Sequence, residues 1–122
     1  MAKKIMVVDD SNAIRQSLVF TLKSAGYEVV EAANGVDALK LMREHTVGLF
    51  ISDVNMPEMD GITLLKKIKE DKDYKHTPVI MLTTEAGGDM ITEGKEAGAK
   101  AWMIKPFQPD QLLGAVKKLF AV

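Results

Sequence analysis

The chain has 122 residues, 47% of them hydrophobic and 27% charged, which is typical of one soluble globular domain spanning 1–122. Sixteen basic and seventeen acidic residues leave a net charge of −1, which argues against a nucleic-acid-binding surface. The absence of cysteine excludes disulfides and thiolate metal sites. The first apolar run has four residues and ends in two aspartates, so it predicts neither a signal peptide nor a membrane span. We therefore expect a cytoplasmic protein.

Short, continuous apolar runs predict the strands of a parallel sheet, because such strands are buried by helices on both faces. The runs cover residues 5–8, 49–51, 79–82 and 101–104. A further strand is expected at 28–32, where the glutamates indicate an edge position that discourages pairing with other chains.

Segments of helical periodicity separate these runs. Gly26 is expected to end the first helix, Asn34 to cap the second, and Pro109 to begin the last. Segment 86–99 contains four glycines, and an interior glycine costs a helix roughly 1 kcal/mol relative to alanine, so this helix should be marginal. The regular alternation predicts an α/β fold, a (βα)5 doubly wound sheet of five parallel strands.

Polar residues follow four of the predicted strands, at the sheet edge where such folds bind ligands. They are Asp9, Asp10, Asp53, Thr83 and Lys105. Three carboxylates that share a site repel one another unless a cation lies among them, and oxygen-only ligands favour Mg²⁺. The lysine and the threonine would then contact phosphoryl oxygens. Each residue alone has a structural explanation, such as a helix cap for the aspartate pair, but together they favour phosphoryl transfer onto an aspartate.

Four sequence blocks around these residues resemble the receiver domains of two-component response regulators, in particular the stand-alone chemotaxis (CheY-like) type. The blocks are 7–11, 52–61, 82–85 and 105–107, and the resemblance extends over the whole chain. It implies a flavodoxin-like strand order of 2-1-3-4-5 and an aspartyl phosphate formed on Asp53.

The resemblance also implies a ligand set for Mg²⁺. Asp9, Asp10 and Asp53 would bind the ion together with the backbone carbonyl of Asn55.

The same resemblance implies roles for residues near the ends of the last two strands. Lys105 would contact the phosphate, and its bond to Pro106 would be cis. Thr83 would be the switch hydroxyl and Trp102 the switch aromatic residue, a position where the family more often has tyrosine or phenylalanine.

By this resemblance the protein is a signalling protein that catalyses only its own phosphorylation and dephosphorylation. Its partners would be a CheA-like histidine kinase, a phosphatase, and a flagellar motor switch protein or another output protein. The output protein would bind the face formed by the fourth helix, fifth strand and fifth helix. We expect a monomer without nucleic-acid or membrane partners.

Two alternatives remain at this stage. The chain could be a phosphorelay intermediate that passes its phosphoryl group to a histidine phosphotransfer protein. It could also be a Mg²⁺-dependent aspartyl-phosphate phosphohydrolase. The second is disfavoured because Asp9 and Asp10 are adjacent rather than two residues apart, and because no cap domain is expected.

Overall fold

A computed structural model describes residues 3–54, 56, 59–83 and 88–120, and within them five strands alternate with five helices. The elements are β1 Lys4–Val8, α1 Asn12–Ser24, β2 Val29–Ala32, α2 Gly35–Glu44, β3 Val47–Asp53, α3 Gly61–Glu70, β4 Val79–Thr83, α4 Gly88–Ala97, β5 Ala101–Ile104 and α5 Pro109–Leu119. This is the predicted (βα)5 order, and the glycine-rich segment does form a helix. Over the described part of the chain, no helix has the length and apolar character needed to cross a membrane.

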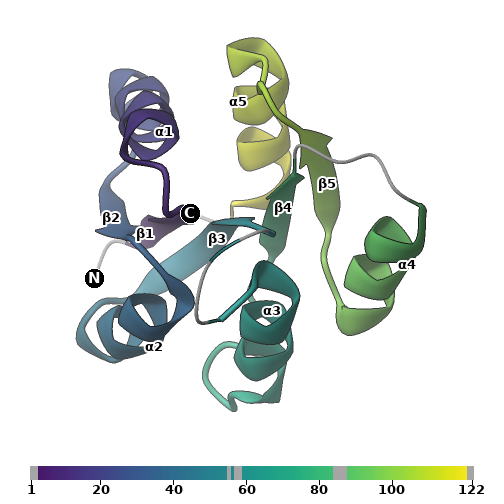
Figure 1. The fold of residues 1–122 in the computed structure, drawn as a ribbon. Coiled ribbons are helices and arrows are strands. Elements are labelled where there is room, and N and C mark those ends of the chain that lie inside the picture. Colours follow the sequence, from purple (N-terminus) through teal and green to yellow (C-terminus); the bar gives the residue numbers. More distant parts are fainter. Residues whose placement is uncertain (1–2, 55, 57–58, 84–87, 121–122) are drawn as a thin grey trace.

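The strands form one parallel sheet in the order β2-β1-β3-β4-β5, which confirms the order implied by the resemblance. Helices α1 and α5 cover one face, and α2, α3 and α4 lie on the other (Figure 1). All residues of β3 and β4 are buried, because these central strands are covered on both sides. Strand β3 extends beyond the predicted apolar run 49–51 at both ends. The added residues are also buried, and they are Val47, Gly48, Ser52 and Asp53.

The ends of the helices largely follow the sequence prediction. Gly26 has a positive φ of 95° just after α1, a conformation that favours glycine. The side chain of Asn34 accepts a hydrogen bond from the Asp37 N–H at 2.8 Å, and Pro109 begins α5. The cap of α1 is Ser11, whose side chain accepts from the Ile14 N–H at 3.3 Å. The helix-cap explanation for the aspartate pair is therefore wrong.

A buried tyrosine forms hydrogen bonds at the amino end of β3, on the opposite side of the sheet from the predicted ligand edge. Tyr74 lies between α3 and β4, and its hydroxyl oxygen is 2.8 Å from the carbonyl oxygens of both Met42 and His45. The same oxygen accepts from the Val47 N–H at 3.4 Å. One hydroxyl thus joins the turn between α2 and β3 to the segment before β4.

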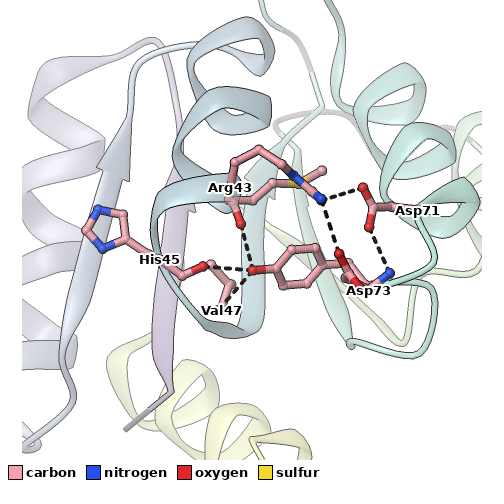
Figure 2. Close-up of polar contacts among 7 residues, drawn as sticks. Arg43, His45, Val47, Asp71 and Asp73 are labelled. Atoms are coloured by element: carbon pink, nitrogen blue, oxygen red, sulfur yellow. Dashed lines mark hydrogen bonds and ion pairs between the residues drawn. The ribbon is translucent and has the colours of Figure 1, made fainter. Parts of the chain in front are cut away.

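Beside this tyrosine, the Arg43 guanidinium lies between the carboxylates of Asp71 and Asp73 (Figure 2). The guanidinium also lies over the Tyr74 ring, 5.5 Å from its centroid. The hydrogen bond from Arg43 is the main reason why the pKa of Asp71 is lowered. The arginine therefore ties α2 to the same segment that Tyr74 anchors.

Candidate functional site

Three carboxylates meet at the carboxyl edge of the sheet. Strands β1 and β3 pair with Val8 opposite Ser52, so the residues that follow, Asp9 and Asp53, are neighbours. With Asp10 they each offer a carboxylate oxygen within 4.8 Å of the others. The residue exposures are 0% for Asp9 and 4% for Asp53, whereas Asp10 is exposed to solvent. Two members of the acidic cluster are thus buried and the third faces water.

Lys105 joins the two buried carboxylates. Its Nζ lies 3.0 Å from Oδ2 of Asp9 and 3.0 Å from Oδ1 of Asp53, and its side chain is only 8% exposed. Burial alone would lower the pKa of the Lys105 ammonium, but hydrogen bonds and charge from the two carboxylates outweigh burial and raise it. The lysine is therefore held as a cation in contact with both acids.

The backbone brings Lys105 next to the predicted switch hydroxyl. The Lys105 N–H donates to the carbonyl of Thr83 at 2.7 Å, across the ends of β5 and β4. The Lys105–Pro106 bond is cis, in agreement with the resemblance. Thr83 is fully buried, and strand alternation places it on the same face of the sheet as Met81 and Trp102.

Hydrogen bonds from α1 and the loop before it hold Asp9 in place. The Ser11 N–H donates to Oδ1 of Asp9 at 2.9 Å, and Nη1 of Arg15 donates to its backbone carbonyl at 2.7 Å. Arg15 also pairs with Glu31 at 3.2 Å, which links α1 to β2. Arg15 is not among the site residues predicted from the sequence, because an arginine on a helix gives no indication that it reaches back to the preceding strand.

Gly61, at the start of α3, packs closely against the backbone of Asp53 and Val54. A Cβ at position 61 would overlap the backbone oxygen of Asp53 and lie 2.8 Å from Cα of Val54. The Gly61 N–H donates to the Val54 carbonyl at 2.8 Å. The first turn of α3 can therefore press against the end of β3 only because residue 61 lacks a side chain. Asn55, whose carbonyl the resemblance assigns to the metal, lies outside the described residues.

The acidic cluster has the chemistry of a divalent-cation site. The donor atoms are carboxylate oxygens, the ligands that hard cations such as Mg²⁺ prefer. Oδ2 of Asp9 is buried and, apart from its ion pair with Lys105, has no hydrogen-bond donor among the described residues. One ammonium against three carboxylates leaves the cluster with excess negative charge when all are ionised, which a cation would offset.

The family model of the response regulator receiver domain matches residues 5–117. The chain belongs to this family. Receiver domains are signalling proteins that act through phosphorylation and generally bind Mg²⁺ at an acidic pocket, and this structure has an acidic cluster of Asp9, Asp10 and Asp53 that could hold such an ion.

Similar proteins agree with this receiver assignment. The "Chemotaxis protein CheY1" of Helicobacter pylori is 42% identical over 111 residues, which cover 89% of this receiver domain and 90% of that protein. The chemotaxis protein CheY4 of Vibrio cholerae has a solved structure with a TM-score of 0.93 and 42% identity, covering 98% of this chain and 100% of that one. The "Transcriptional regulatory protein SrrA" of Staphylococcus aureus is 38% identical over 119 residues, or 98% of this chain but only 48% of that protein.

Proposed function

We propose that this protein is a single-domain response regulator that receives a phosphoryl group on Asp53 from the phosphohistidine of a histidine kinase. The observation that carries the proposal is the buried carboxylate of Asp53, 3.0 Å from the Lys105 ammonium and within the acidic cluster. The receiver family match across residues 5–117 favours this function over the phosphohydrolase alternative.

In the proposed reaction an oxygen of Asp53 attacks the phosphorus atom. An O–P bond forms while the N–P bond of the phosphohistidine breaks, and the released imidazole nitrogen takes up a proton. Lys105 already contacts Asp53 and would bind a phosphoryl oxygen, while the hydroxyl of Thr83 would donate to another. Hydrolysis of the acyl phosphate by water would regenerate the aspartate.

Asp9 and Asp10, with Asp53, would hold Mg²⁺, to which the family resemblance adds the carbonyl of Asn55. When bound, the ion offsets the repulsion between the aspartate and the incoming phosphoryl oxygens. Asp9 is well suited to this role, because Ser11 and Arg15 fix it from two sides.

We infer that the output of this regulator is reversible protein binding in chemotaxis. Phosphorylation would place a phosphoryl group that carries about two negative charges on Asp53, and this group would draw Thr83 towards it. Trp102 would respond on the same sheet face and change the surface formed by α4, β5 and α5. A flagellar motor switch protein is the output partner we favour, because CheY1 and CheY4 carry chemotaxis names and match nearly the whole chain. In this role the protein would be a cytoplasmic monomer that a phosphatase also binds.

The test is phosphorylation by acetyl phosphate in the presence of Mg²⁺, read as intact mass. The parent should gain one phosphoryl group and Asp53→Asn none. Asp60→Asn is the matched control, because Asp60 caps α3 through the Thr63 N–H at 2.7 Å and asparagine caps helices equally well. Labelling of Asp53→Asn to the parent's extent would overturn the proposal.

A second assay separates an output regulator from a relay intermediate. Phosphorylated protein is mixed with a histidine phosphotransfer protein from the same source, and the phosphoryl group is followed. We expect it to stay on the receiver until it is hydrolysed. Rapid and complete transfer to the histidine would favour the relay alternative.

A further inference from the structure

The indole of Trp102 occupies a notch in α4 that exists because residue 94 is glycine. Gly94 is buried in the interior of the helix. A Cβ built on Gly94 would overlap Cζ3 of Trp102 and lie 3.0 Å from Cε3 and Cη2. The six-membered ring of the indole therefore rests directly on the helix backbone, where any side chain would displace it.

Packing, rather than hydrogen bonding, holds the ring in this notch. Nε1 of Trp102 is buried and has no hydrogen-bond partner within the part of the chain that the structure describes. The ring packs against the apolar core on the face of the sheet that α2 and α3 cover. Ala97 at the end of α4 and Ala99 just after it pack against the same core. Because no polar contact from a described residue fixes the indole, we expect its position to depend on where the backbone of α4 lies.

A glycine in the interior of α5 serves as a comparison. Gly114 lies within α5, and a Cβ built there would meet no atom within 4 Å. Replacing an interior glycine by alanine favours the helix by about fivefold in its equilibrium constant when nothing obstructs the methyl group. Gly114 should follow this general rule, whereas Gly94 should not.

We propose that Gly94 is a positioning residue for Trp102, and that the notch couples the placement of the indole to the placement of α4. The proposal rests on the proposed function, in which this face carries the output. The glycine acts through the ring and has no part in phosphoryl transfer. A methyl group at position 94 would force the indole out of the notch or push α4 away from the sheet.

A double-mutant cycle with Trp102→Ala tests this coupling. Gly94→Ala should lower the urea midpoint of the parent, followed by circular dichroism, because the methyl group and the ring compete for one space. In the Trp102→Ala background the same change should raise the midpoint, since the obstruction is gone. Gly114→Ala should raise it in both backgrounds. If Gly94→Ala raises the midpoint of the parent as Gly114→Ala does, the notch does not position the ring and the proposal is wrong.

Indole fluorescence provides a readout that a purely structural glycine would not move. In Gly94→Ala the emission of Trp102 should shift to longer wavelength and acrylamide should quench it faster, while Gly114→Ala leaves both unchanged. Beryllofluoride with Mg²⁺, which stands in for the phosphoryl group, should change the emission of the parent and have a reduced effect on Gly94→Ala. An unchanged beryllofluoride response in Gly94→Ala would contradict the coupling.

Phosphorylation distinguishes failure of this inference from failure of the proposed function. Acetyl phosphate should label Gly94→Ala as fully as the parent, because Gly94 does not contact Asp53. A parent that is not labelled would refute the proposed function, and the stability cycle would still decide the role of Gly94. A labelled parent with additive effects of Gly94→Ala and Trp102→Ala would refute the inference alone.

Discussion

Replacement of Lys105 by methionine should strongly destabilise the metal-free protein. Methionine keeps the apolar stem but removes the ammonium that lies 3.0 Å from both Asp9 and Asp53. The side chains of these carboxylates are 0% and 6% exposed, so water cannot replace the lost charge. Removing one partner of a buried ion pair costs about 3–5 kcal/mol, and here two carboxylates lose the same partner. We expect a loss of about 3 kcal/mol or more, a large share of the stability of a small domain.

The measurement is urea unfolding of Lys105→Met and parent in EDTA and again in Mg²⁺. Mg²⁺ should recover much of the loss, because it can neutralise the same carboxylates and binds only the folded state. Lys66→Met is the control, since the pair between Lys66 and Glu93 is more than half exposed on both sides and should be worth under about 1 kcal/mol. If Lys105→Met matches Lys66→Met in EDTA, the ion pairs of Lys105 do not stabilise the fold and the reasoning is refuted.

Three further predictions concern stability. Asp10→Asn should stabilise the metal-free protein by roughly 1 kcal/mol and weaken Mg²⁺ binding, because it relieves repulsion in the cluster; urea unfolding in EDTA that shows a loss would contradict this. Tyr74→Phe should cost about 1–3 kcal/mol, since the carbonyl oxygens of Met42 and His45 lose their buried hydroxyl donor; a thermal midpoint equal to the parent's would refute it. Arg43 holds the pKa of Asp71 in the folded protein below its ordinary value of 3.8. The pair therefore stabilises the protein above that pH, and the stabilisation is lost as acid protonates Asp71. Acid unfolding should start at a higher pH in Arg43→Met.

The fold and the acidic cluster could be predicted because both depend on rules that act along the chain. Strands buried on both faces appear as uninterrupted apolar runs, and parallel strands bring all their carboxyl ends to one edge. Asp9, Asp53 and Lys105 lie at or just after the carboxyl ends of three separate strands, so a parallel sheet brings them to the same edge. The order of the strands came from the family resemblance, since periodicity does not determine which strands are neighbours.

The features that the sequence did not reveal depend on contacts between distant residues. Gly48 interrupts an apolar run, but it is buried, and the Phe120 ring lies so close that a Cβ at position 48 would be 2.7 Å from it. Tyr74 contacts Met42 across 32 positions of the chain. Neither contact has a local sequence signature, because the partner is set by packing of elements that are far apart in sequence.

Segment 86–99 shows how such a contact changes the meaning of a residue. In the sequence, its glycines indicate only a weak helix. In the structure, the absence of a side chain at Gly94 makes room for the indole of Trp102, the largest side chain. The penalty for helix formation and the space for the ring are therefore two consequences of one glycine. If the ring of Trp102 moves on phosphorylation, as proposed, a helix of low intrinsic stability that rests on this ring should move with it, and the glycine that lowers the stability of α4 would also link α4 to the switch.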